Sequence, residues 1–129
     1  VNYLIEDAKS RQINVVTNVK LPEDLKLSQY RMNIIAGNLL ENAIEAAAKS
    51  TEKKVYFSIQ YSGGMLYLQI KNTYEGTICI RNGTVVGKSK MQGHGIGLRS
   101  VRDLVDEQKG KMDISVDGNL FIAEVMLAL

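Results

Sequence analysis

A pair of glycines between two strand-like segments constrains the fold more than any other feature of the sequence. The stretch "VYFSIQYSGGMLYLQIKN" (55–72) reads as two strands joined at Gly63-Gly64. Glycine supplies the positive φ angles of a two-residue hairpin turn. The segment therefore predicts an antiparallel β-hairpin.

Three further stretches predict strands. "CIRNGTVV" (79–86) is a weaker hairpin signal centred on Asn82-Gly83, and 111–129 forms two strands around Asp117-Gly118. "INVVTNVKLP" (13–22) predicts one more strand, which stops at Pro22, the single proline of the chain.

Two long helices separate these strands. Ser28 is a suitable N-cap for a helix that runs to about Lys49, and at about 100° per residue its apolar side chains share one side. The apolar side holds Met32, Ala36, Leu39, Leu40, Ala43, Ala46 and Ala47, and the other flank holds Asn38, Glu41, Asn42 and Glu45. A second helix is expected from about Gly95, closed by Gly110 as its C′ residue.

This order of elements predicts an α+β fold. Antiparallel hairpins interleaved with two long helices imply a two-layer sandwich, with a mixed, mostly antiparallel sheet and helices on one face. At 129 residues the chain is expected to be one domain, in which residues 1–11 form the end of a linker helix. Since it begins with Val1, we expect it to be a piece of a longer protein.

Composition excludes several classes of function. A net charge of +2, with scattered basic residues, gives no surface for duplex nucleic acid. Cys79 is the single cysteine, so no internal disulfide and no Cys/His zinc spacing is possible, which suits a reducing cytosol. No apolar run approaches the roughly 20 residues of a membrane span.

"GHGIGL" (93–98) places three glycines around His94, the only histidine. It lacks the G-x-G-x-x-G spacing of a Rossmann turn and the spacing of a P-loop. A glycine loop that opens a helix remains, because such a loop turns unpaired N–H groups and the positive end of the helix dipole toward an anion. The alternative is a flexible turn with incidental glycines.

Asparagines supply a second set of polar groups. Asn38 and Asn42 lie one turn apart, with only ~40° between them, and amide oxygens can ligate Mg²⁺. The alternative is that they hydrogen-bond a neighbouring loop. Asn72 in "KNTYEG" (71–76) ends a strand beside the two helices, where ligands commonly sit, although a lone asparagine there is also a turn former.

Taken in order, these motifs resemble the ATP-binding domain of the GHKL superfamily, which includes gyrase, the MutL repair proteins and sensor histidine kinases. The resemblance spans about residues 20–129 and implies the Bergerat-type ATP-binding fold. "NLLENA" resembles the N box, so Asn42, with Asn38 beside it, is implied as a Mg²⁺ ligand. "NTYEG" falls on the D-x-G-x-G box, which gives Asn72 and Gly76 to the adenine site. The resemblance makes 77–92 a mobile lid that carries Lys88 and Lys90. It makes the final motif the phosphate-binding loop, with Gly93, His94, Gly95, Ile96, Gly97 and Leu98.

The sequence departs from the family pattern at two positions of the D-x-G-x-G box. Asn72 replaces the adenine-binding aspartate and Tyr74 replaces the first glycine of the box, which predicts weaker nucleotide affinity. This relaxed box and "GHGIGLRSV" look most like the kinases that sense autoinducing peptides in Gram-positive bacteria. Asn38 stands where hydrolysing members carry a glutamate, and an amide is no general base. Phosphoryl transfer is therefore favoured over hydrolysis.

The resemblance predicts a histidine kinase catalytic domain that uses ATP and Mg²⁺. Its phosphoacceptor would be a histidine on the protein's own N-terminal dimerisation domain, so His94 would only lie beside the phosphates. A response regulator would be the next partner, and the parent would be a homodimer in the bacterial cell membrane with this domain in the cytoplasm. Two alternatives stay open, an anti-sigma-type serine kinase and a non-catalytic nucleotide-binding or interaction module.

Overall fold

The computed structural model describes residues 2–22, 29–76, 79–81, 84–86 and 94–128. Within these residues the chain forms three helices and seven strands. In chain order they are α1 (Asn2–Ser10), β1 (Asn14–Lys20), α2 (Gln29–Ala48), β2 (Lys54–Ser62), β3 (Met65–Thr73), β4 (Cys79–Arg81), β5 (Thr84–Val86), α3 (His94–Glu107), β6 (Lys111–Asp117) and β7 (Leu120–Ala128).

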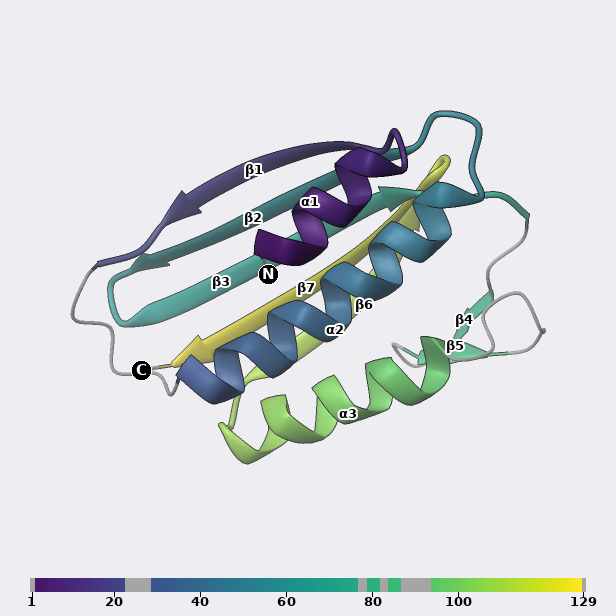
Figure 1. The fold of residues 1–129 in the computed structure, drawn as a ribbon. Helices are drawn as coiled ribbons and strands as arrows, with labels where there is room; N and C mark the ends of the chain where they lie inside the picture. Colours follow the sequence, from purple (N-terminus) through teal and green to yellow (C-terminus); the bar gives the residue numbers. More distant parts are fainter. Residues whose placement is uncertain (1, 23–28, 77–78, 82–83, 87–93, 129) are drawn as a thin grey trace.

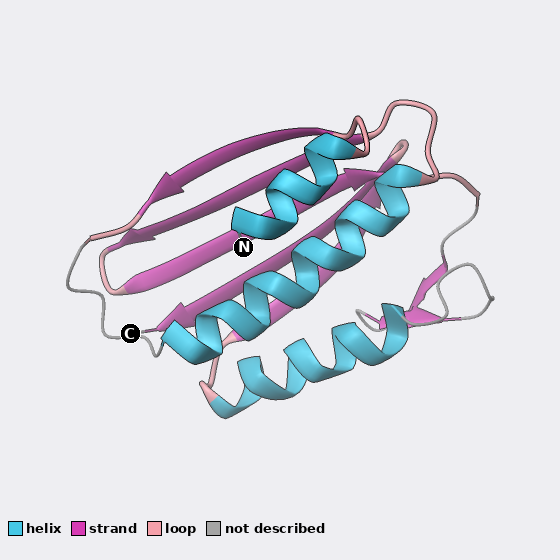
Figure 2. Cartoon of the chain, viewed as in Figure 1, coloured by secondary structure: helices cyan, strands magenta, loops and turns pink. Residues whose placement is uncertain are grey.

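Five of the strands form one open sheet in the order β1-β2-β3-β7-β6. β1 pairs with β2 in parallel, and the other neighbours are antiparallel. The three helices lie on one face of this sheet (Figure 1), and β4 and β5 form a small separate hairpin beside the start of α3 (Figure 2). The predicted α+β two-layer sandwich is therefore confirmed.

The hairpin around Gly63-Gly64 has the predicted geometry. Both glycines have positive φ, 58° and 83°, and Ser62 pairs with Met65 across the turn. Alternate side chains of β2 and β3 are buried beneath the helices: Val55, Phe57, Ile59, Leu66, Leu68 and Ile70.

α2 supplies the largest share of helical core residues and packs against β3 and α3. Its predicted apolar side is confirmed for Ala36, Leu39, Leu40, Ala43 and Ala47, all at most 2% exposed. Ile35 and Ile44 are equally buried, so the buried arc is wider than predicted because α2 contacts both a strand and a helix. Ala46 is only half-buried. Ser28 and the side chain of Met32 lie outside the described part.

One helix end differs from the prediction, since Gly110 is not the C′ residue of α3. Lys109 adopts the left-handed conformation, with φ of 57°. Its N–H donates to the Asp106 carbonyl at 2.9 Å, and the Gly110 N–H donates to the Val105 carbonyl at 2.9 Å. This is a Schellman motif with Lys109 at C′ and Gly110 at C″. Position 110 requires glycine for a different reason: a Cβ there would overlap the backbone oxygen of Met126.

Two further hairpins are confirmed. β4 pairs with β5 from Cys79↔Val86 to Arg81↔Thr84. β6 pairs with β7 through a turn in which Gly118 has a φ of 60°. Across the described ranges, none of the helices combines the length and apolar character needed to span a membrane.

Candidate functional site

The segments that carry the predicted site residues meet at one end of the domain. α2 packs against both β3 and α3. Figure 1 shows that β3 ends, α2 ends and α3 begins at the same end of the sheet, where the β4–β5 hairpin also lies. Residues far apart in the sequence are thereby placed around one corner of the molecule.

Asn42, on α2, is the most informative of the predicted site residues. Its side chain is half-buried on α2, and within the described structure its Nδ2 is the buried side-chain polar atom that lacks a hydrogen-bond partner. Buried polar groups are normally paired, so an unpaired one needs an explanation. The amide can be turned to present either its nitrogen or its oxygen. A ligand at this position could therefore use Asn42 as a donor to phosphate or as an oxygen ligand to a cation.

Asn38 lies one helical turn before Asn42 and is also half-buried. The neighbouring acidic residues Glu41 and Glu45 are exposed to solvent. The amides thus occupy the boundary between the buried and the solvent-facing sides of α2, where a ligand can reach them without entering the core.

Asn72 is the residue before the end of β3 and is buried, 2% exposed. It pairs with Val55 on β2 and Phe121 on β7. Its Nδ2 donates to the Thr73 carbonyl at 3.0 Å, which fixes the amide. Oδ1 is then the atom of this side chain that can accept a hydrogen bond from a ligand.

A buried hydroxyl pair, missed by sequence reasoning, holds the end of β3 against the end of α2. The hydroxyls of Ser50 and Thr73 share a hydrogen bond of 2.6 Å, and both residues are at most 5% exposed. The Thr73 hydroxyl also accepts from the Lys54 N–H at 3.0 Å, and the Ser50 hydroxyl donates to the Ala47 carbonyl at 2.8 Å. The position of Ser50 just after a helix indicates a side-chain hydrogen bond to the backbone. Its hydroxyl partner Thr73, however, is 23 residues away in the sequence.

The residues after β3 are fastened to two different turns. The Tyr74 N–H donates to the Asn119 carbonyl, and its hydroxyl donates to the Gly118 carbonyl, both at 3.2 Å. The Glu75 carboxylate accepts from the N–H and the hydroxyl of Thr51 at 2.9 and 2.6 Å. Gly76 follows with a φ of 91°, a conformation that strongly favours glycine.

The glycine loop opens a helix, as predicted, since α3 begins at His94. The first N–H groups of an α-helix have no partner within the helix, and here the helix begins at His94. Leu98 is 6% exposed and belongs to the hydrophobic core, so it anchors the helix start. The side chains of residues 94–97, and all of Lys88, Lys90 and Gly93, lie outside the described residues.

Comparison with known proteins identifies the family. The family profile described as "GHKL domain" matches residues 27–128. The chain belongs to the GHKL family. No curated protein matches this GHKL domain in sequence.

Solved structures share the fold of this GHKL domain. Full-length ShkA, solved in complex with AMPPNP, gives a TM-score of 0.71 at 15% identity over 98% of this chain and 27% of that one. The catalytic domain of the histidine kinase ThkA gives 0.66 at 21% identity over 99% of this chain and 91% of that one. The histidine kinase AdeS of Acinetobacter baumannii gives 0.64 at 18% identity over 98% of this chain and 64% of AdeS. The GHKL domain therefore spans just under two thirds of AdeS.

The predicted site residues of this GHKL domain suit a cation that is bound partly by protein oxygens and partly by a bound ligand. No group of three His, Cys, Asp or Glu side chains able to hold a metal occurs within the described residues. Mg²⁺ is commonly bound by one or two protein oxygens together with substrate phosphates and water. An amide at Asn42 and one at Asn38 fit that kind of site.

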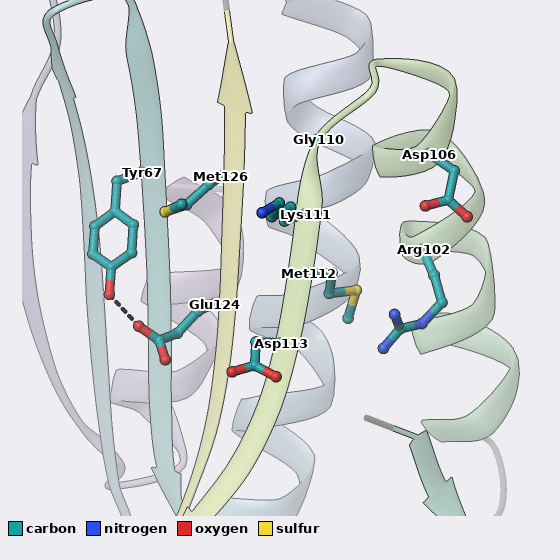
Figure 3. Close-up of a pocket in the computed structure, with 9 residues that line it drawn as sticks. All are labelled: Tyr67, Arg102, Asp106, Gly110, Lys111, Met112, Asp113, Glu124 and Met126. Carbon is teal, nitrogen blue, oxygen red and sulfur yellow. Dashed lines mark hydrogen bonds between the residues drawn. The ribbon is translucent and has the colours of Figure 1, made fainter. Parts of the chain in front are cut away.

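A pocket of about 510 Å³ lies away from this corner, at the other end of α3. Figure 3 shows its lining, with Arg102 and Asp106 on α3, Asp113 on β6 and Glu124 on β7. It contains none of the predicted site residues, and its acidic and basic groups are mixed.

Tyr67 on β3 donates its hydroxyl to the Glu124 carboxylate within this pocket. Partial burial of the phenol, followed by the hydrogen bond to Glu124 and the charge of that carboxylate, raises the pKa of Tyr67 to about 12. The tyrosine is neutral over the physiological range, which makes it a hydrogen-bond donor and not a base.

Proposed function

We propose that this GHKL domain binds Mg-ATP and donates the γ-phosphoryl group to a histidine on a separate dimerisation domain. The observation that carries the proposal is the buried Nδ2 of Asn42, which lacks a hydrogen-bond partner; turning the amide would place Oδ1 in that position instead. Asn42 stands on α2, which packs against α3, and the N–H groups of the first turn of α3 would be available to an anion. Phosphate and a cation have complementary groups at this corner.

Each residue has a defined task in the proposal. Asn42, assisted by Asn38, holds Mg²⁺, which when bound neutralises the charge on the phosphate oxygens. Asn72 accepts a hydrogen bond from the adenine amino group through Oδ1. The N–H groups at the start of α3 position the phosphates, with Lys88 and Lys90 as further cationic partners. Gly76 keeps the chain close to the base without a side chain in the way.

Transfer is favoured over hydrolysis because of position 38. A water molecule needs a general base to attack the γ-phosphate efficiently, and the amide of Asn38 cannot accept a proton in this way. Glu41 and Glu45 are exposed on the same helix but stand at other positions of the motif. Rate acceleration would come from positioning and charge neutralisation.

The proposed partners follow from the phosphoacceptor. His94 lies within the phosphate-binding loop, so we assign the acceptor histidine to the protein's own N-terminal dimerisation domain. A response regulator would then receive the phosphoryl group. We place the domain in the cytoplasm and the parent, as a homodimer, in the bacterial membrane, among the kinases that sense peptide pheromones.

Calorimetric titration of the domain with Mg-ATP tests nucleotide binding. Asn42→Ala should weaken the affinity for Mg-ATP by about tenfold or more while leaving the midpoint of thermal unfolding nearly unchanged. Glu45→Ala is the matched control, because Glu45 lies three residues along the same helix and is exposed. If Asn42→Ala binds Mg-ATP as tightly as the Glu45→Ala control, the assignment of the metal site is wrong.

Incubation with γ-labelled ATP tests the phosphoryl transfer. The domain alone should remain unlabelled, and addition of the parent's dimerisation segment should produce acid-labile label on that segment. Acid-labile phosphate on His94 of the isolated domain would contradict both the role of His94 and the two-domain mechanism.

A further inference from the structure

β1 presents an unprotected edge of the sheet. Among the described elements it pairs only with β2, and nearly every one of its side chains is exposed. Val16 is 49% and Val19 is 58% exposed, although both are strand-forming apolar residues. An exposed edge strand of this kind can pair with another strand.

The other edge of the sheet is protected in a way that β1 is not. β6 has the sequence KMDISVD, in which Lys111, Asp113 and Asp117 are charged and exposed. Charged side chains discourage the pairing of edge strands. β1 has the sequence NVVTNVK, and its single charge, Lys20, stands at the end of the strand. The difference points to a partner at the β1 edge.

The direction of the backbone groups shows which residues of β1 can pair outward. The Asn14 N–H donates to the Lys53 carbonyl on the β2 side at 2.9 Å. In a parallel pair, alternate residues direct both backbone groups toward the neighbouring strand. Asn14, Val16, Asn18 and Lys20 therefore face β2, whereas Val15, Thr17 and Val19 direct their N–H and C=O groups away from it.

We propose that β1 pairs antiparallel with β1 of a second copy of this chain, about a twofold axis at Thr17. In this register Thr17 lies opposite itself, and Val15 lies opposite Val19 of the second copy. Each of these outward residues then forms a hydrogen-bonded pair with an outward residue, with two hydrogen bonds per pair. Registers centred on Val16 or Asn18 leave one outward residue of each strand unpaired.

The side chains of β1 are compatible with this self-pairing. Val15 packs against the hydrophobic core beneath the helices, so Thr17 and Val19 share that face by strand periodicity. In the proposed pair, the exposed Val19 gains Val15 of the second copy as its cross-strand neighbour, which favours pairing. Lys20 lies opposite Asn14, so no two like charges meet.

The interface is small. A pair of seven-residue strands falls at the lower end of specific interfaces, below about 1,200 Å², so we expect association at about 0.1–1 mM chain. This contact does not depend on the proposed nucleotide site, because it involves none of that site's residues. Asn42→Ala should therefore associate as wild type does.

Charge substitutions at Thr17 test the twofold axis. On such an axis any charge opposes itself, so Thr17→Lys and Thr17→Glu should each weaken self-association at least tenfold at low ionic strength. An equimolar mixture of the two variants should associate again, because a lysine on one strand then faces a glutamate on the other. Thr17→Val is the matched control and should associate as wild type or more tightly. Sedimentation equilibrium up to about 1 mM chain measures the wild type, the three variants and the mixture.

A cysteine pair provides an independent readout if charges at position 17 affect folding. In a Cys79→Ser background, Thr17→Cys should form an intermolecular disulfide readily, since hydrogen-bonded pairs place Cα atoms about 5.5 Å apart. Val19→Cys lies on the same face but meets Val15, and should cross-link poorly. A wild-type domain that stays monomeric at about 1 mM overturns the proposal, and so does self-association that is insensitive to charge at position 17.

Discussion

Replacing Gly110 with alanine should destabilise the domain strongly, although alanine is usually a conservative change for glycine. A Cβ at this position would overlap the backbone oxygen of Met126, with the Leu127 Cδ2 atom only 2.5 Å away and the Val105 Cγ1 atom at 3.3 Å. Gly110 does not have a positive φ, so the effect comes from space and not from backbone conformation.

The size of the effect follows from what would have to move. Overpacking of a well-packed interior costs about 1–3 kcal/mol. The nearest atom here is a strand carbonyl that pairs within the sheet, so it cannot rotate away as a side chain would. We expect about 3 kcal/mol, which is roughly 10 °C in Tm for a domain of this size. Urea denaturation and thermal unfolding followed by circular dichroism would measure it.

Two other glycines serve as controls for this series. Gly37 lies inside α2, and a methyl group added there would have nothing within 4 Å, so Gly37→Ala should stabilise the domain by about 0.5–1 kcal/mol. Gly118 also has open space but a φ of 60°, so Gly118→Ala should cost about 1 kcal/mol through backbone strain. Equal stability of Gly110→Ala and wild type would refute the packing argument.

Three further predictions concern single side chains. Thr73→Val should cost about 1–3 kcal/mol in urea denaturation, because it removes the hydroxyl that bonds to Ser50, whereas Thr73→Ser should cost less. The raised pKa of Tyr67 means that the folded state holds this proton more tightly, so its stabilising contribution is complete below about pH 10 and is lost as the pH rises through about 12. Tyr67→Phe should therefore lose less stability than wild type between these two pH values, and an identical alkaline slope would contradict this. Asn38→Glu should raise the slow rate of ATP hydrolysis by supplying a general base, and an unchanged rate in a phosphate-release assay would show that another group limits the reaction.

Local signals predicted most of the fold. The Gly63-Gly64 turn and the alternating strands around it depend on neighbouring residues, so the sequence was sufficient to place that hairpin. The parallel pairing of β1 with β2 was not predictable in the same way, because a period of two identifies a strand but not its partner. The requirement for glycine at position 110 was not predictable either, because it arises from contact with Met126 on another strand.

The candidate site likewise combines features that the sequence shows and features that depend on packing. The asparagines and the glycines at the start of α3 were proposed as site residues from their order and spacing along the chain, and their ligand roles stay predictions. The Ser50–Thr73 pair was missed because its partners are brought together only by packing of α2 against β3. The unpaired amide of Asn42 was equally invisible, since burial of one atom depends on the whole surrounding structure.

The junction of β3 and β7 has a consequence for how this domain can vary. The two strands pair along their whole length, from Met65↔Ala128 to Thr73↔Leu120, and Tyr74 is fastened to Gly118 and Asn119 just beyond the last pair. The chain between these points also forms α3, which packs on α2, and β6, which pairs with β7, so only the part between Gly76 and α3 is a loop excursion from this closed base. Loop-closure entropy rises slowly, so doubling the length of such an excursion adds only about 0.6 kcal/mol. The stretch between Gly76 and α3 can therefore be lengthened, shortened or exchanged as a cassette while the sheet keeps its register.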